Sequence, residues 1–194
     1  MADEVEIKFR IKDLSQVQER LKQAGFREET SRTHEMNTLY DRDSVLRNHG
    51  QLLRLRKYGE KWTLTHKSKG VNARHKTRQE LETKVADGEH MDQIIRALGY
   101  QPSFRYEKFR SEWSDGQGHV VLDETPIGNL GEIEGKPEWI DEIAKKLEIS
   151  DDQFITKSYA ELFFDWKRET GSNANDMTFG AIGAESPAIG KVIG

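Results

Sequence analysis

Residues 4–11 read EVEIKFRI, a stretch that alternates strictly between charged and apolar side chains. Successive side chains of a strand point to opposite faces, so the pattern predicts a strand with one charged face and one apolar face. If the charged face meets water, this is an ordinary surface strand. If it points inward, several charges are buried together, and such burial requires a ligand.

The composition is polar for a globular protein and limits the classes of function. The 194 residues include 30 basic and 34 acidic side chains, for a net charge of −4, and 35% of the chain is hydrophobic. A net acidic chain does not favour duplex nucleic acid as a partner. The absence of cysteine excludes disulfides and thiolate metal sites, and no apolar run approaches the roughly 20 residues of a membrane span. We therefore expect a soluble cytoplasmic protein, either a monomer or a homodimer.

Period-two patterning predicts eight strands, and helical spacing of apolar residues predicts four helices. The expected strands lie near 3–11, 30–40, 51–58, 61–67, 77–86, 103–114, 118–124 and 129–135. The helical stripes begin at Leu14, Met91, Ile140 and Tyr159. Turns that contain glycine at 58–62 and 114–119 predict hairpins between the strands that they join.

The two halves of the chain resemble each other. Glu4, Glu6 and Lys8 correspond to Glu80, Glu82 and Lys84, and each half continues as a helix and three strands. Two four-stranded halves make an eight-stranded sheet that can close on itself. We therefore expect an α+β fold: an eight-stranded antiparallel closed β-barrel, with the helices packed outside against the apolar strand faces.

In such a barrel the charged strand faces line the lumen. Several strands carry same-face charges dominated by Arg and Glu, whereas a solvated face usually mixes in Ser, Thr, Asn and Gln. They are Glu4 with Glu6 and Lys8, Arg54 with Arg56, Glu80 with Glu82, Lys108 with Arg110, and Glu132 with Glu134, while Lys67 and Asp123 stand singly. Carboxylates without thiols suit Mg²⁺ or Mn²⁺, and grouped Arg and Lys suit phosphate. Together they indicate a metal-bound polyphosphate.

These residues resemble the CYTH superfamily, also called the triphosphate tunnel metalloenzymes. The E-x-E-x-K signature of residues 4–8 is short, but the ordered set after it is more specific: LLRLR, TLTHKSKG, TRQELE, EKFR, VVLDETPIGNLGEIEG and TKSYAELF. The resemblance covers about residues 3–168. The family includes class IV adenylate cyclases, thiamine triphosphatases, inorganic tripolyphosphatases and RNA triphosphatases.

The resemblance implies a tunnel of eight antiparallel strands that holds Mg²⁺ or Mn²⁺ and grips a triphosphate. Carried over by position, the implied metal ligands are Glu4, Glu6, Asp123, Glu132 and Glu134, with Glu80 and Glu82 at a second metal or orienting basic residues. The implied substrate-binding residues are Lys8, Arg54, Arg56, Lys67, Lys108, Arg110 and Lys157. Of these, Lys8, Lys67 and Arg110 are the expected catalytic residues.

We expect a divalent-metal-dependent enzyme that acts on a small-molecule triphosphate such as ATP, thiamine triphosphate or tripolyphosphate. Hydrolysis is slightly favoured over other outcomes, because it requires no base pocket and the sequence has no nucleoside-specific motif. One alternative is a class IV adenylate cyclase that converts ATP to cyclic AMP and pyrophosphate. Another is a non-catalytic polyphosphate-binding module, although such a module has no need of clustered carboxylates.

Composition divides the chain at residue 169. Residues 1–169 form the expected tunnel domain, and residues 170–194 read TGSNANDMTFGAIGAESPAIGKVIG, which is rich in Gly, Ala, Ser and Asn. This composition is typical of a flexible tail. The alternative is that Met177, Phe179 and Ile182 dock over the site as a lid.

Overall fold

The computed structural model describes residues 2–184, without the side chains of Ala2, Asp3 and Asn72. Its strands are β1 (Ala2–Arg10), β2 (Arg27–Asp41), β3 (Leu52–Tyr58), β4 (Lys61–Lys67), β5 (Val71–Asn72), β6 (Lys76–Val85), β7 (Gln101–Ser114), β8 (His119–Thr125) and β9 (Gly128–Glu134). Its helices are α1 (Leu14–Gln23), α2 (Val45–Asn48), α3 (Gly88–Ala97), α4 (Pro137–Lys146), α5 (Tyr159–Thr170) and α6 (Phe179–Ile182), with a 3₁₀ turn at Asp151–Gln153. All eight expected strands and all four expected helices are confirmed.

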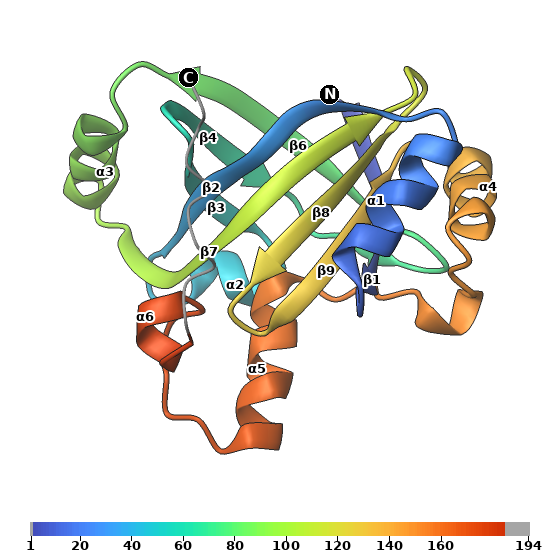
Figure 1. Ribbon diagram of the computed structural model, residues 1–194. Coiled ribbons are helices and arrows are strands. Elements are labelled where there is room, and N and C mark those ends of the chain that lie inside the picture. Colours follow the sequence, from blue (N-terminus) through green and yellow to red (C-terminus); the bar gives the residue numbers. More distant parts are fainter. Residues whose placement is uncertain (1, 185–194) are drawn as a thin grey trace, which may run out of the picture.

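The strands close into a barrel. The sheet runs in the order β1-β9-β8-β7-β2-β3-β4-β6, and β6 pairs back with β1, for example through the register neighbours Glu6 and Lys76. Every pairing is antiparallel, and the short β5 adds only a two-residue extension beside β6. The closed barrel leaves no pair of open edges along its circumference (Figure 1). The expected α+β barrel is therefore confirmed, and the similarity of the two halves is real: each is a strand, a helix and three long strands.

Helices cover the barrel from outside, as their apolar stripes predict. Helices α1 and α4 pack over β1, β8 and β9, where Leu21 and Ile140 join a buried cluster with Ile7 and Ile133. Gly131 is required in this layer, because a Cβ atom there would lie 2.2 Å from the ring of Phe9. Helix α3 covers the opposite side through Ile95 (Figure 1).

The sequence sets the helix ends in ways that elementary chemistry explains. Asp13 caps α1 by accepting a hydrogen bond from the backbone N–H of Gln16, and Asp87 caps α3 through His90 in the same way. Both helices end before a glycine, Gly25 or Gly99, each with φ +90°, a conformation that costs glycine little. These matched caps place the strand that follows each helix back into the barrel.

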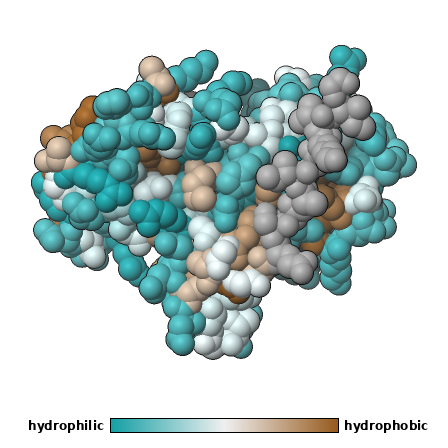
Figure 2. Space-filling view, turned by 60° about the vertical axis from the view of Figure 1, so that its left-hand side comes forward, coloured by the Kyte–Doolittle hydropathy of each residue, from teal (hydrophilic) through white to brown (hydrophobic). Residues whose placement is uncertain are grey.

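The face of the molecule in Figure 2 is mostly polar. In Figure 2, hydrophilic side chains cover most of the face that is shown, and apolar patches are small and separate. Among the helices of the described chain, none combines the length and the apolar character needed to cross a membrane. The four tryptophans all belong to the apolar layers between helices and barrel, Trp113 and Trp139 at their buried centre and Trp62 and Trp166 at their margins.

Residues 171–184 differ from the expectation of a flexible tail. Met177 is fully buried and Phe179 nearly so, and the backbone of Met177 pairs with β7. The physical reason is that this segment carries three apolar side chains and reaches a strand edge with free hydrogen-bonding groups. Met177 and Phe179 do not line the tunnel, so the lid alternative is not what the structure shows either. Residues 185–194 of the expected tail lie outside the described chain.

Candidate active site

The charged face of the first strand points into the barrel. Glu6 and Lys8 are buried, and both line one cavity of about 960 Å³ that fills the lumen. The alternative of an ordinary solvated strand is therefore wrong. The basic residues that line this cavity are Lys8, Arg47, Arg54, Arg56, Lys67, Lys69, Lys76, Arg78, Lys108 and Arg110, and the acidic ones are Glu4, Glu6, Asp41, Glu80, Glu82, Glu132, Glu134 and Glu161.

Carboxylates gather where β1 lies beside β9. Glu6 is the register neighbour of Glu134, and Lys8 is the register neighbour of Glu132. Glu134 is partly open to solvent but lines the cavity, and reduced hydration of its carboxyl group, followed by the negative charges of Glu4, Glu132 and Glu6, raises the pKa of Glu134 to about 7. This crowding of like charge is the electrostatic condition that a divalent cation relieves.

Two lysines are tied to this acidic group. Nζ of Lys67 lies 2.6 Å from Oε1 of Glu4 and 2.7 Å from Glu80 on the next strand. Nζ of Lys8 lies 2.7 Å from Glu6 and 3.3 Å from Glu132. Burial alone would lower the pKa of Lys8, but the charges of Glu132 and Glu6 outweigh it and hold that pKa above its ordinary value.

The chemistry of the donor set fits a hard divalent cation. All the candidate donors here are carboxylate oxygens, which Mg²⁺ and Mn²⁺ prefer, and thiol ligands are absent from the sequence. Among the side chains that the structure describes, no three acidic or histidine groups already converge at metal-binding spacing. Glu4 and Glu6 instead contact Lys67 and Lys8. The assignment of Glu4, Glu6, Glu132 and Glu134 as metal ligands therefore stays a prediction.

A second network fixes Lys108 and Arg110. The guanidinium of Arg110 makes two hydrogen bonds of 2.7 Å with the carboxylate of Asp123, and a third of 2.9 Å with Glu132. Lys108 donates to the same Asp123 at 3.0 Å. Tyr159, the first residue of α5, donates its hydroxyl hydrogen to Asp123 as well. Asp123 is fully enclosed and acts here as the partner of basic groups, so the prediction that it binds a metal gains no support from its contacts.

Arg54 and Arg56 form a basic wall on β3. Arg54 donates to the hydroxyl oxygen of Thr65 at 3.3 Å, and Arg56 donates to that of Thr63 at 3.1 Å. The Glu82 carboxylate lies 3.6 Å from Arg54 and 3.3 Å from Arg56. Glu82 and Glu80 thus orient basic residues in this structure, which was one of the two expected roles.

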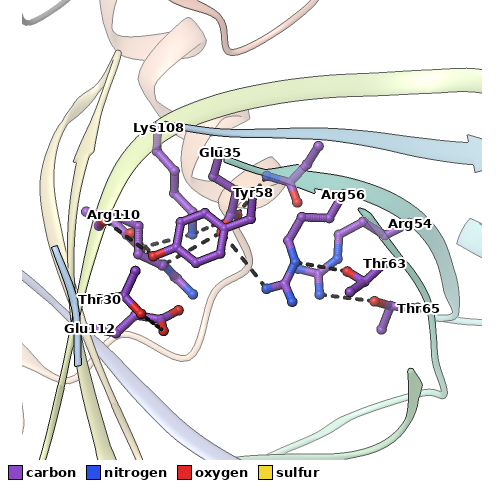
Figure 3. Close-up of polar contacts among 12 residues, drawn as sticks. Thr30, Glu35, Arg54, Arg56, Tyr58, Thr63, Thr65, Lys108, Arg110 and Glu112 are labelled. Atoms are coloured by element: carbon purple, nitrogen blue, oxygen red, sulfur yellow. Dashed lines mark hydrogen bonds and ion pairs between the residues drawn. The ribbon is translucent and has the colours of Figure 1, made fainter. Parts of the chain in front are cut away.

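Glu35 and Asn37 on β2 were not predicted, although both are completely buried in the lumen wall. Figure 3 shows Glu35 among Lys108, Arg110 and Arg56, and its carboxylate lies 3.5 Å from Lys108 and 4.0 Å from each arginine. Burial would raise the pKa of Glu35, but these three positive charges lower it to about 2. The missed signal was same-face alternation, which is hard to read in β2 because both of its faces carry polar residues.

Lys76 and Arg78 also belong to the site. Neither residue was among the expected site residues, but both side chains line the cavity. Burial, followed by repulsion from Lys8, lowers the pKa of Lys76 to about 8. Arg78 is held by the carbonyl oxygens of Ser68 and Gly50, which fixes its guanidinium without neutralising its charge.

Lys157 is the one implied substrate-binding residue that the structure places elsewhere. Its Nζ pairs with Asp165 at 2.6 Å, its side chain is more than half exposed, and it lines a separate surface pocket. The chain turns between Lys157 and the start of α5, so Ser158 and Tyr159 face the tunnel instead. The expectation that Lys157 grips phosphate does not match this arrangement.

One mouth of the tunnel carries an apolar ledge. We define it by Leu39, Leu52, Phe104 and Phe164, all of which line the cavity. Leu52 lies two residues from Arg54 on the same face of β3, and Leu39 is the register neighbour of Arg54. The ledge is therefore continuous with the basic wall. Arg47 stands over the ring of Phe164, with 5.6 Å between the guanidinium carbon and the ring centroid.

Comparison with known proteins identifies relatives and structures that are similar to this chain. A protein of Methanocaldococcus jannaschii named "Putative adenylate cyclase MJ0240" is 35% identical over 170 residues, which span 82% of this chain and 97% of that protein. The structure of a "putative adenylate cyclase" from Vibrio parahaemolyticus superimposes with a TM-score of 0.74 at 20% identity, covering 83% of this chain and 97% of the other. A Hippeastrum structure, described as a "putative adenylyl cyclase" with "a dominant triphophatase activity", has a TM-score of 0.60 at 19% identity and covers 84% and 96%.

The last two likenesses are below 25% identity and concern the fold alone. The model of the CYTH domain matches residues 2–159, which include every strand of the barrel and the first residue of α5. This chain belongs to the CYTH domain family.

Proposed function

We propose that this protein is a divalent-metal-dependent enzyme that hydrolyses the triphosphate group of organic or inorganic triphosphates. The observation that carries the proposal is the lining of one closed tunnel, in which many basic side chains face a crowded group of carboxylates. Basic groups alone would suit any polyanion. The added carboxylates suit a polyanion that arrives with a cation, and a triphosphate is the common biological anion of that kind.

The roles of the basic residues follow from how each is held. Arg54 and Arg56 are oriented by threonine hydroxyls and Glu82, and Arg78 by backbone carbonyls. We assign these guanidinium groups to the phosphate oxygens, which they can bind in a forked geometry. Lys8 and Lys67 stand between the acidic group and the basic wall, where they would neutralise charge that develops during phosphoryl transfer.

Glu4, Glu6, Glu132 and Glu134 would hold the metal. A bound Mg²⁺ or Mn²⁺ neutralises phosphate charge and polarises the bond that breaks. The chain itself supplies position: the phosphate chain is fixed along the tunnel, and a water molecule replaces the leaving diphosphate at the terminal phosphorus atom.

Cyclisation of ATP is the second candidate function. It would use the ribose 3′-hydroxyl in place of water, with attack on the α-phosphorus and loss of pyrophosphate. Two observations favour it: the relative that is 35% identical is named as an adenylate cyclase, and the apolar ledge offers a surface for an organic group. The Hippeastrum neighbour is named as a putative adenylyl cyclase but described with a dominant triphosphatase activity. The fold therefore does not decide between cyclisation and hydrolysis.

Product analysis separates these functions. The protein is incubated with Mg²⁺ or Mn²⁺ and, separately, with ATP, thiamine triphosphate and tripolyphosphate, and the products are separated by chromatography. We expect phosphate release from all three, with tripolyphosphate at least as good a substrate as ATP. Cyclic AMP as the main product from ATP would establish the cyclase instead. Tight binding of tripolyphosphate without turnover of any compound would indicate a binding module.

A further inference from the structure

Strand β7 is longer than its neighbour β8, so part of one edge of β7 extends beyond the pairing within the closed barrel. Its partner β8 covers only the part from Phe109 to Ser114. Beyond that part, the segment around Met177 takes the place of a strand: the N–H of Met177 donates to the carbonyl oxygen of Arg105 at 2.9 Å, and the N–H of Glu107 donates to the carbonyl oxygen of Met177 at 3.1 Å. Figure 1 shows α6 beside this end of β7.

Side chains anchor the same segment. The carboxylate of Asp176 accepts a hydrogen bond of 2.8 Å from the N–H of Arg105, and that of Glu107 accepts one of 2.8 Å from the N–H of Phe179. The ring of Phe179 packs against Phe109 with 5.9 Å between centroids. Residues 172–184, which we call the strap, lie outside the part of the chain that the CYTH domain matches.

The strap stands directly behind the tunnel wall. Met177 is fully buried and shares one apolar cluster with Tyr106 and Tyr159. The rings of these two tyrosines are stacked, with 5.4 Å between centroids and 13° between planes. Nζ of Lys108 lies 4.3 Å from the centroid of the Tyr159 ring, and the Tyr159 hydroxyl donates to Asp123. An unbroken series of contacts therefore joins Met177 to the charged groups of the lumen.

We propose that the strap positions Tyr106 and Tyr159, and through them the pair of Lys108 and Asp123, so that Lys108 is placed for contact with a triphosphate. This inference rests on the proposed function, because Lys108 lines the tunnel in which that function places the triphosphate. An uncovered strand edge opens locally at low free energy, and the strap prevents such opening at Arg105 and Glu107. A displacement of about 1 Å in a charged group is enough to lower turnover strongly. Met177 is on this view a positioning residue.

The test compares four full-length proteins with the wild type: Met177→Ala, Met177→Leu, Asp176→Ala and Asn175→Ala. Asn175 is an exposed neighbour in the strap and serves as the matched control. Each variant is first shown to be folded at 25 °C by circular dichroism. The values of kcat and KM for tripolyphosphate with Mg²⁺ are then measured, together with hydrogen exchange of peptides that cover residues 104–110.

We expect Met177→Ala to lower kcat/KM about 10-fold, mainly through kcat, and to speed exchange at Glu107. Met177→Leu should restore both, Asp176→Ala should show the same changes to a smaller degree, and Asn175→Ala should match the wild type. A strap that only stabilises the fold would lower Tm and leave kcat/KM of the folded variants unchanged, which would overturn the proposal.

The design also separates this inference from the proposed function. If the wild type neither binds nor turns over tripolyphosphate, the proposed function fails, and hydrogen exchange still tests the strap. Unchanged exchange over residues 104–110 in both Met177→Ala and Asp176→Ala would then refute positioning by the strap. If Met177→Ala does not fold, Asp176→Ala carries the kinetic comparison, because Asp176 is partly exposed and its loss removes one hydrogen bond.

Discussion

Oε1 of Glu35 lies 3.5 Å from Nζ of Lys108, and the two side chains are almost completely enclosed by the tunnel wall. A buried carboxylate among Lys108, Arg110 and Arg56 offsets part of the positive charge that the empty tunnel would otherwise concentrate. Glu35 therefore acts as a built-in counter-ion. In the proposed function, it would hold these basic groups in place before the triphosphate binds.

Replacement of Glu35 should lower the stability of the protein when no ligand is bound. We expect Glu35→Gln to lower the free energy of unfolding by about 3 kcal/mol, because the buried and half-buried positive charges of Lys108, Arg110 and Arg56 then lose one of their negative partners. Urea unfolding at pH 7 measures this loss, with Glu28→Gln, an exposed position on the same strand, as the control. Tripolyphosphate should then raise Tm more in Glu35→Gln than in the wild type, since the ligand relieves a larger excess of positive charge.

The opposite charge change provides the comparison. Arg56→Ala removes a basic group from the same cluster, so tripolyphosphate should raise Tm less than in the wild type. Equal ligand-induced shifts in all three proteins would contradict a role of this cluster in binding polyphosphate.

The acidic group leads to a prediction about metal. Glu6→Gln keeps the shape of a side chain that is buried beside Lys8 but removes its charge. We expect the affinity for Mg²⁺, measured from the Mg²⁺ dependence of turnover, to fall on the order of 100-fold, the upper range of losses seen when the surroundings of a metal are altered. The exposed Glu89→Gln in α3 is the control. An unchanged Mg²⁺ dependence would remove Glu6 from the metal site.

Residues 4–11 show how far a sequence can predict this fold. Their strict alternation predicted both the strand and a charged inner face, because one apolar face had to meet the helices. Glu35 was missed for the converse reason: on β2 the outward-facing His34, Met36 and Thr38 give no apolar stripe that would identify the inner face. The side chains of β2 do alternate between its two faces, but the sequence does not indicate which face lines the lumen.

The remaining differences have local causes. The role of Lys157 was carried over from the family pattern, whereas its direction depends on the turn before α5, which alternation does not describe. The strap was read as a tail because its composition is rich in small residues. Its order depends on an open edge of β7 that becomes visible only when the strands are paired. Helices of four residues, such as α2 and α6, are too short to show helical periodicity.

Lys76 leads to a prediction about protons. Its pKa is about 8 in the folded protein because of burial and of repulsion from Lys8 and Arg78, against an ordinary value of 10.5. Between pH 8 and pH 10.5, Lys76 is protonated to a greater extent in the unfolded chain than in the folded protein. The stability that neutral Lys76 contributes to the folded protein is therefore fully present above pH 10.5 and is lost as the pH falls through 8. A bound polyanion favours the charged form. Binding of tripolyphosphate at pH 8.5 should therefore take up protons.

Calorimetry in two buffers with different ionisation enthalpies measures that uptake. We expect the uptake to decrease strongly in Lys76→Met, a variant that keeps the apolar stem and cannot be protonated. The exposed Lys61→Met is the matched control, and it should behave as the wild type does. Binding without proton uptake in the wild type would show that Lys76 does not meet the phosphates.

The ledge leads to a prediction about the organic end of the substrate. Phe164 is 41% exposed although it is a large apolar residue, and its ring lies 6.3 Å from that of Phe104 at the tunnel mouth. Stacking of a base on an aromatic side chain contributes about 1–3 kcal/mol. We therefore expect Phe164→Ala to raise KM for ATP about 10-fold, which corresponds to about 1.4 kcal/mol, and to leave KM for tripolyphosphate unchanged, because the latter has no group to place there. The control is Leu98→Ala, at an exposed position directly after α3. Parallel changes for the two substrates would place the organic group elsewhere, whichever reaction the tunnel catalyses.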